Sequence, residues 1–532
     1  MTAADSVSSR NRQIARSTAL VMVAFGLAKA ISLVQTVIIF QSLGIKAEMD
    51  AFASANRIPE QIFNLISGGA LAHAFIPIFS GFLARDDTEG AWRTARHVVN
   101  AVFTLTLLVS LVVFVTAPWL VANVVAPGFD DTTHQQTVEL MRILLVSTLI
   151  FSVSGISMGI LQSHQRFLLP ALAPVMFDVG ILIGVVFLLK PYGVHGVAIG
   201  AVLGSALHFG IQVPGLIRVR ARWWPDLDLK DPVLWRVVRL MLPRVAGLGV
   251  IGLNFLVMGN IASRLGTSSV AALDSGWRLM QIPETLIGTA MGTVIFPTLA
   301  ALSELGDVNG KRDAMSGALR FILIATIPSA VGLIVVGRPL ISLLEGGEFD
   351  AVASDLVYST LRFFALGLIV HSTLEVVARS FYADKDTLTP LWAALGGAAI
   401  NLVLAISLSD IIGVSGLALA NSSGVAFEVI VLLWMLRRRW HGVNENLLAR
   451  TTVKTLVASL VMALAVVLVD ALWNALGLSG QGRAMTIVQV VVEVIVGAVV
   501  FLAAALAMKM HELRTLLALV LRRPTVLAEQ GI

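Results

Sequence analysis

Apolar runs of about 20 residues recur along this chain, and short polar segments separate them. A run of that length spans a bilayer as an α-helix and is too long for a strand of a membrane barrel. Helices also hydrogen-bond all their backbone groups internally, as lipid requires. The pattern therefore predicts an all-α polytopic membrane protein with about 14 transmembrane helices, near 17–42, 52–82, 98–125, 137–162, 169–189, 192–216, 234–262, 268–299, 316–337, 355–378, 388–409, 412–436, 453–476 and 485–508.

Composition agrees with a membrane protein and excludes several kinds of site. The chain is 57% apolar and 13% charged, whereas a soluble domain is about half apolar and a quarter charged. It contains no cysteine, so it forms no disulfide and no thiolate metal site. The net charge of +5 resides in short loops between the apolar runs, so no nucleic-acid partner is expected.

The loops predict the orientation of the chain in the membrane. About 27 of the 38 Lys and Arg residues fall in the two terminal segments and in alternate loops, among them 217–239 and 379–387, and five fall in the opposite loops. Cytoplasmic loops carry the excess of positive charge, so both termini are expected in the cytoplasm. The first apolar run exceeds the core of a signal peptide and is interpreted as a retained span.

A stretch in the second run, Asp50 to Phe82, is repeated later in the chain. Pro59 and Glu60 recur 224 positions on as Pro283 and Glu284, and Pro77 recurs 220 positions on as Pro297. The first copy thus holds about one more helical turn between its prolines.

Two further landmarks recur at an offset of 220: Pro170 with Pro390, and Gly193 with Gly413. The repeat predicts two parallel six-helix halves around a central cavity, residues 1–220 and 221–440. Residues 441–532 have no counterpart and would add two extra C-terminal helices and a tail.

The candidate functional residues are charges inside apolar runs, because no sequence signature of an enzyme is present and the protein is interpreted as a transporter. Lys29 and Arg278 lie near the middle of their spans, and Arg57 lies closer to an end. Three cations in a cavity would bind an anion such as a pyrophosphate head group. The alternative is that they form structural ion pairs or reach the membrane surface at helix ends.

A second set of residues is expected to line the cavity or to act as a gate. Prolines and glycines inside a span free backbone groups and permit bending, although small residues also allow helices simply to pack closely. Asp274 lies one turn before Arg278 and is the candidate partner for a purely structural ion pair. The full set is Asp50, Pro59, Glu60, Gly68, Gly69, Pro77, Asp274, Pro283, Glu284 and Pro297. No metal and no cofactor are expected.

Several of these motifs together resemble the MurJ (MviN) family of lipid II flippases, over nearly the whole chain. Asp50-Ala51-Phe52, Ala55 to Pro59 and Ala74 to Pro77 resemble the family's second span. Trp277-Arg278-Leu279 resembles its eighth-span arginine motif, and Asp386 to Pro390 resembles its Asp-Thr-x-Thr-Pro segment.

The resemblance implies membership of the multidrug/oligosaccharidyl-lipid/polysaccharide exporter superfamily. It implies a flippase that moves a polyprenyl-pyrophosphate-linked peptidoglycan precursor, lipid II, to the outer leaflet of the bacterial cytoplasmic membrane by alternating access. The partners implied are that precursor, the bilayer, and a coupling ion or the membrane potential. Several family charges are absent, since Gln35, Thr36, Phe63, Gly68 and Trp277 stand in their places.

Three other functions are left open by the sequence. The first is a flippase for another polyprenyl-linked glycan, and the second is a multidrug or cation antiporter of the same superfamily. The third is a silent scaffold that recruits synthesis enzymes. The surplus of cations in the spans and the two extra helices argue against an antiporter.

Overall fold

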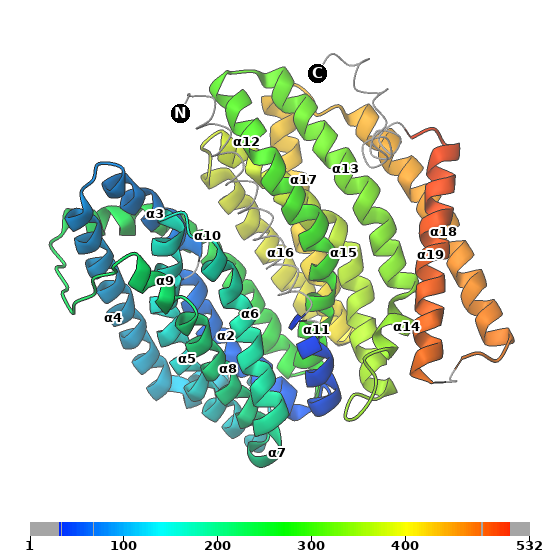
Figure 1. The fold of residues 1–532 in the computed structure, drawn as a ribbon. Helices are drawn as coiled ribbons and strands as arrows, with labels where there is room; N and C mark the ends of the chain where they lie inside the picture. Colours follow the sequence, from blue (N-terminus) through cyan, green and yellow to red (C-terminus); the bar gives the residue numbers. More distant parts are fainter. Residues whose placement is uncertain (1–30, 33, 68, 480–481, 511–532) are drawn as a thin grey trace. The chain divides into compact units, whose positions relative to one another are not determined.

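The computed structural model describes residues 31–32, 34–67, 69–479 and 482–510, and helices make up nearly all of them (Figure 1). Within these residues no strand is formed, apart from one isolated bridge between Gly346 and Phe349. The chain divides into two compact units. The first comprises residues 1–271 with 346–349, and the second comprises residues 272–345 with 350–532.

The first unit is built around α5, a 33-residue helix that packs against α2, α3, α4 and α8. Gly180 of α6 and Gly184, the first residue of the following segment η3 (Gly184–Leu188), meet Gly204 and Gly200 of α8 so closely that a Cβ on any of them would collide with backbone. Small residues give membrane helices this close approach. The helices are α2 (Ala47–Ile62), α3 (Gly69–Leu83), α4 (Thr88–Leu120), α5 (Asp131–Ser163), α6 (Leu168–Ile183), α7 (Leu189–Tyr192), α8 (Val194–Gly210), α9 (Val213–Arg218) and α10 (Pro232–Ser263).

The second unit has α15 at its centre, packed against α12, α13 and α17. On the other side of α13 lies α18, which pairs with α19 (Figure 1). The helices are α11 (Ser269–Glu284), α12 (Ala290–Glu304), α13 (Val308–Val335), α14 (Gly337–Ser342), α15 (Ala351–Ala383), α16 (Leu388–Ile412), α17 (Val414–Arg439), α18 (Glu445–Ala475) and α19 (Arg483–Ala507).

Four short π-helical segments interrupt the longer helices: η1 (Phe63–Ser67), η2 (Val121–Val125), η3 (Gly184–Leu188) and η4 (Thr285–Thr289). Two of them, η1 and η4, divide the two copies of the proline-containing stretch found in the sequence. A π-helical turn marks a local disturbance of the helical hydrogen bonding and frequently accompanies a functional site.

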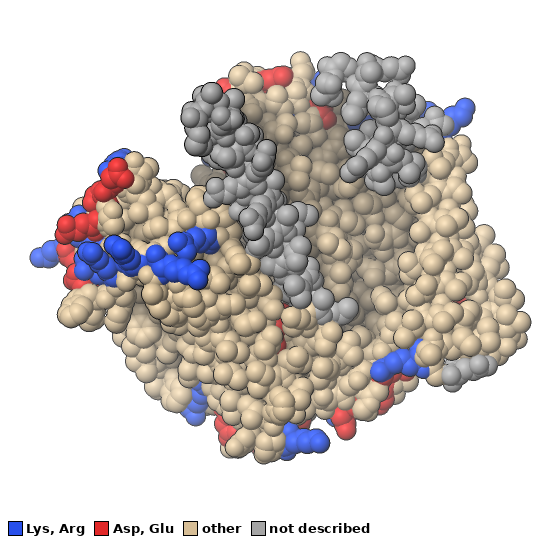
Figure 2. All heavy atoms as spheres, viewed as in Figure 1, with Lys and Arg blue, Asp and Glu red and all other residues tan. Residues whose placement is uncertain are grey.

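The prediction of an all-α polytopic membrane protein is confirmed. Among the described residues, twelve helices are long and apolar enough to cross a membrane, and they match predicted spans 3 to 14. Figure 2 shows broad uncharged surfaces between groups of charged side chains at the helix ends. The count of fourteen is not confirmed, because most of the first predicted span lies outside the described residues and the second is present as the shorter helices α2 and α3.

The repeat is visible in the backbone as well as in the sequence. Helices α5 and α15 both contain 33 residues and begin 220 positions apart. Gly193 and Gly413 share one unusual conformation, with φ of 56° and 60° and ψ of −146° and −142°. A non-glycine residue would be strained there, so both glycines are required by the turn.

The cap before α4 recurs before α13. Asp87 accepts a hydrogen bond from the Gly90 amide, and Asp307 accepts one from the Gly310 amide, each at 2.8 Å. The division after residue 271 does not coincide with the repeat, since α10 packs on α2 and α3 of the first unit. The three-part division at 220 and 440 describes the repeat and stays a prediction.

Candidate functional site

Both copies of the repeated stretch form a helix that is broken in the same way. In the first copy, 16 residues of α2 precede five residues of η1 and 15 of α3. In the second, 16 residues of α11 precede five of η4 and 15 of α12. The extra turn between the first pair of prolines therefore does not lengthen the element as a whole. Both copies break at the same position along the helix, and the spacing of the prolines differs because the prolines lie at different distances from that break.

The prolines predicted as gate residues fall into two groups. Pro59 and Pro283 lie in the helix just before the π segment, where a missing backbone N–H weakens the regular hydrogen-bond ladder. Pro77 and Pro297 lie inside α3 and α12 with exposed rings. Gly69 is the first residue of α3, whereas Gly68 lies outside the described residues. The role of these residues as a gate stays a prediction.

Of the three predicted anion-binding cations, Arg57 is buried, with 8% of its surface exposed. Its Nη1 donates a 2.7 Å hydrogen bond to the Phe255 carbonyl of α10. Gly259 of α10 leaves room for the guanidinium, since a Cβ there would lie 2.6 Å from Cζ of Arg57. Gly252, two turns earlier on α10, makes the same room for Gln61. Arg57 thus holds α2 against α10.

Arg278 lies in a different environment, on an exposed position of α11. It makes no hydrogen bond and no ion pair with any of the residues that the structure describes. Its neighbour Trp277 instead packs edge-on against Phe364 and His371 of α15, with ring centroids 5.4 and 5.1 Å apart. Trp277 therefore anchors α11 to α15, and Arg278 lies on an accessible face of α11.

The remaining charged candidates are held by polar contacts. The buried Asp50 accepts hydrogen bonds from the backbone amides of Ser268 (2.6 Å) and Ala271 (2.7 Å), and thereby caps the start of α11. Exposed Glu60 accepts from Asn56, one turn away, at 3.1 Å. Half-buried Asp274 forms no ion pair with Arg278, so the structural pair considered from the sequence is absent. Lys29, the third predicted cation, lies outside the described residues.

Glu284 belongs to a polar cluster that sequence reasoning found only in part. It accepts from the hydroxyls of Thr285 and Thr289 of η4, at 3.4 and 3.3 Å. Arg379 of α15 donates to the Thr289 carbonyl at 3.3 Å and pairs with Glu375 at 2.9 Å. The break in the helix thus frees the backbone carbonyl of Thr289, which accepts a hydrogen bond from Arg379 of the neighbouring helix α15.

The sequence predicted that the span ends near residue 378 and that a loop begins at Arg379, whereas α15 continues to Ala383, so the loop was predicted to begin too early. A signal was present, since opposite charges four residues apart, as at Glu375 and Arg379, favour a continuing helix.

The Asp-Thr-x-Thr-Pro segment also has a clear local role. Asp386 accepts from the Thr389 amide at 3.0 Å, from the Thr389 hydroxyl at 2.7 Å and from Arg439 at 2.7 Å. Burial alone would raise the pKa of Asp386, but these hydrogen bonds and the arginine charge lower it below its ordinary value. The motif fixes the turn that starts α16 and ties it to the end of α17.

Comparisons with known proteins agree on one family. The family model described as "Lipid II flippase MurJ" matches residues 39–488. The lipid II flippase MurJ of Burkholderia cenocepacia is 29% identical over 423 residues, which are 78% of this chain and 82% of that protein. The probable lipid II flippase MurJ of Rhizobium meliloti is 30% identical over 414 residues, 75% of this chain and 76% of that protein.

Solved structures share the fold. A structure of the lipid II flippase MurJ in an inward closed conformation aligns with a TM-score of 0.77 and 23% identity, covering 92% of this chain and all of that one. A multidrug transporter of the MATE family in an inward-facing conformation aligns with a TM-score of 0.68 and 15% identity. The alignment covers 80% of this chain and 99% of the MATE transporter.

Proposed function

This chain belongs to the MurJ family of lipid II flippases, and we propose that it moves lipid II from the inner to the outer leaflet of the cytoplasmic membrane. The observation in the structure that best supports the proposal is the state of Arg278. An accessible arginine on a broken membrane helix, without a partner among the described residues, is costly unless an anionic ligand binds there. A pyrophosphate group suits its planar, five-donor guanidinium.

Arg278 is accordingly proposed as the head-group ligand, together with Lys29. Arg57 is the least favourable of the three predicted cations for this role, because its hydrogen bond to the Phe255 carbonyl already orients it. Its role is instead to hold α2 against α10. Glu284 and Arg379 sit at η4 and are proposed to control how the broken helix α11–η4–α12 bends.

The competing function in the same superfamily is export of a drug or cation. Nearly the whole MATE transporter, 99% of its chain, aligns with 80% of this chain, so this chain carries substantial additional sequence. Helices α18 and α19 lie outside the internal repeat and add a hairpin beside α13. Extra membrane surface of this kind suits a substrate with a long lipid tail better than a small cation.

The decisive experiment is complementation of a bacterial strain depleted of its own lipid II flippase, combined with a lipid II accessibility assay on its vesicles. The wild-type chain should restore growth and outer-leaflet lipid II. Arg278→Ala should restore neither, whereas Arg264→Ala, a matched change of an exposed arginine at the end of α10, should restore both. Failure of the wild-type chain, at normal membrane level, would contradict the assignment to lipid II.

The predicted orientation is tested separately. The chain lacks cysteine, so single cysteines report their own accessibility without background. Cysteines at Asp131 and Asp350, both exposed, should react with an impermeant thiol reagent from outside intact cells. Cysteines at Arg93 and Arg438, also exposed, should react only after the membrane is opened. The reverse pattern would place both termini outside.

A further inference from the structure

The hairpin of α18 and α19 contains a row of polar side chains that has no role in the proposed head-group site. Asn474 donates to Asp470 Oδ2 at 3.3 Å, and Gln489 donates to Asp470 Oδ1 at 2.9 Å. Gln489 also donates to Glu493 Oε1 at 2.8 Å. Asn474 is exposed and lies next to the end of α18, whereas Glu493 lies ten residues into α19. The row therefore leads from a helix end into the membrane span.

Glu493 ends this row in an unusual state. Only 1% of its surface is exposed, and its Oε2 has no hydrogen-bond donor within the described part of the chain. The amide of Gln489 has two hydrogens, and both are used, one on each carboxylate. Burying an ionised carboxylate without a counter-ion costs more free energy than burying a neutral acid whose hydroxyl lacks an acceptor. The protonated form of Glu493 therefore has the lower free energy.

We propose that Glu493 is a proton-binding site, entered through Asn474, Asp470 and Gln489 from the end of the hairpin that the predicted orientation places outside. The step is a protonation: one O–H bond forms at Oε2, and water on the outer side supplies the proton. A metal cation fits the site poorly. Among the buried side-chain oxygens of the row, only Glu493 Oε2 lacks a donor from the described residues, whereas hard cations take several oxygen ligands. The described residues also contain no group of three potential metal-binding side chains.

The consequence of protonation follows from the packing around Glu493. One turn further along α19, Gly497 brings the two helices together. A Cβ at Gly497 would lie 3.2 Å from Val466 and 3.5 Å from Met462 of α18. Val490 packs with Val466 and with Val336 at the end of α13. An ionised Glu493 in this dry seam would draw in water and part the helices, so the neutral acid keeps the hairpin closed.

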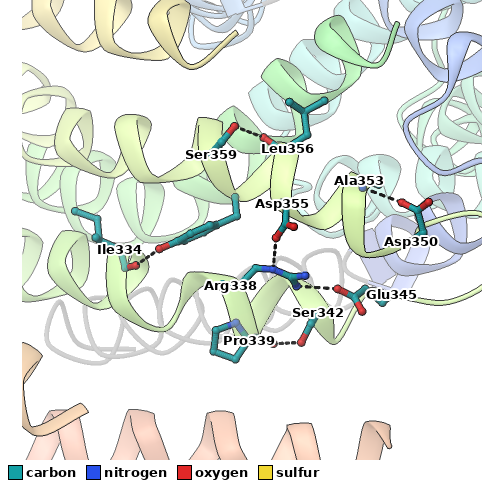
Figure 3. Close-up of polar contacts among 11 residues, drawn as sticks. Ile334, Arg338, Pro339, Ser342, Glu345, Asp350, Ala353, Asp355, Leu356 and Ser359 are labelled. Atoms are coloured by element: carbon teal, nitrogen blue, oxygen red, sulfur yellow. Dashed lines mark hydrogen bonds and ion pairs between the residues drawn. The ribbon is translucent and has the colours of Figure 1, made fainter. Parts of the chain in front are cut away.

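Within the described residues, no cation on the neighbouring elements pairs with Glu493. The charged group that acts on it is Asp470 of α18, which carries the same sign. Figure 3 shows Arg338 of α14 held between Glu345 and Asp355, at 2.7 and 2.5 Å. Arg483, at the start of α19, donates to the Glu345 carbonyl. The charges of α13 lie in its first half, away from Val336: Lys311, Arg312, Asp313 and Arg320. Lys454 of α18 donates to the Met508 carbonyl at the opposite end of the hairpin.

The site is tested with the full-length protein in lipid nanodiscs, by infrared difference spectra between acidic and alkaline buffer. The wild type should show the carbonyl band of a protonated carboxylic acid that disappears as the pH rises. The isosteric Glu493→Gln variant should lack that band. Asp470→Asn, which keeps an acceptor for Gln489 but removes the negative neighbour, should lose the band at lower pH than the wild type. An unchanged band in Glu493→Gln would overturn the proposal.

A second measurement asks whether the proton controls transport, and this part rests on the proposed function. In proteoliposomes with the pH varied only on the outer side, wild-type flipping of lipid II should depend on pH over about two units, as for one titrating group. Glu493→Gln should flip lipid II at the acidic wild-type rate at every pH. A response to Na⁺ at constant pH, instead of to pH, would replace the proton by a cation.

The two proposals fail in different ways. If the wild type flips no lipid II at any pH but shows the infrared band, the proposed function fails and the proton site stands. If flipping is normal and Glu493→Gln retains the full pH dependence, the control by Glu493 fails and the flippase stands.

Discussion

The two broken helices, α2–η1–α3 and α11–η4–α12, share one backbone plan and differ in their charges. In the first, Arg57 belongs to the broken helix itself, is buried, and bonds to a carbonyl of α10. In the second, Arg278 is exposed without a partner among the described residues, and the arginine that bonds to a carbonyl is Arg379 of the neighbouring helix. The repeat keeps the position at which the helix breaks, while the arginines differ: Arg57 makes a structural contact, and Arg278 is the one that we propose for binding.

The largest expected effect is on transport and comes from Arg278. Arg278→Ala removes a charge-assisted contact to the substrate, worth about 1.5–3 kcal/mol, so flipping at limiting lipid II should fall about 10- to 100-fold. Thermal stability should stay at the wild-type level because the side chain is exposed. Arg278→Lys should keep part of the activity, since the charge persists but the planar geometry does not. Normal flipping by a well-expressed Arg278→Ala protein would show that Arg278 does not bind the substrate, and the contrast with Arg57 would no longer hold.

Arg57 should behave in the opposite way, with the larger effect on stability. Arg57→Ala leaves the Phe255 carbonyl without this donor and opens space beside Gly259, at an expected cost of about 1–3 kcal/mol in the free energy of unfolding. Thermal denaturation in detergent would measure the loss, with Gln61→Ala as the control on the same face of α2. Wild-type stability combined with a transport defect equal to that of Arg278→Ala would make Arg57 a second substrate ligand.

Arg379 should give an intermediate effect, confined to the second copy. Arg379→Ala removes the donor to the Thr289 carbonyl and the partner of Glu375, with an expected loss of about 1 kcal/mol. Hydrogen exchange should become faster in η4 and remain unchanged in η1. Glu375→Gln, which keeps Arg379 in place, should accelerate exchange less. Equal acceleration in both π segments would show that their breaks are coupled rather than locally maintained.

The smallest expected effect is on the stability of the protein in acid, and it comes from Asp386. Asp386 has its counterpart at Arg166, 220 positions earlier, so only the second copy has a carboxylate at this turn. Because the pKa of Asp386 is lowered, its stabilisation is complete above the usual carboxylate range and is lost as the pH falls below about 4. Asp386→Asn should cost about 1 kcal/mol near neutral pH, as for a lost cap.

The same variant should also lose part of the acid sensitivity of the melting temperature between about pH 5 and 3. Arg166→Gln, the matched change in the first copy, should leave that sensitivity as it is. A melting curve of Asp386→Asn with the full wild-type acid dependence would show that other carboxylates determine it.

Some features follow from the sequence because they depend on neighbours along the chain. Twenty-residue apolar runs must become helices in lipid, since no other partner is available for their backbone groups. The glycine turns at Gly193 and Gly413 and the caps at Asp87 and Asp307 obey local rules of the same kind, and they recur at one offset. Of the prolines expected to permit bending, Pro59 and Pro283 lie just before the two breaks, whereas Pro77 and Pro297 lie inside α3 and α12.

What tertiary structure alone decided is the environment of each charge. The same residue type is buried at Arg57, exposed at Arg278 and engaged with a neighbouring helix at Arg379. The positions of Arg57 and Arg379 depend on Gly259 and Gly292, glycines distant in the chain, where a Cβ would collide with the guanidinium. Burial and hydrogen bonding are properties of packed surfaces, and a linear pattern does not specify which surfaces meet. The unpartnered oxygen of Glu493 became evident for the same reason, only once α18 was packed against α19.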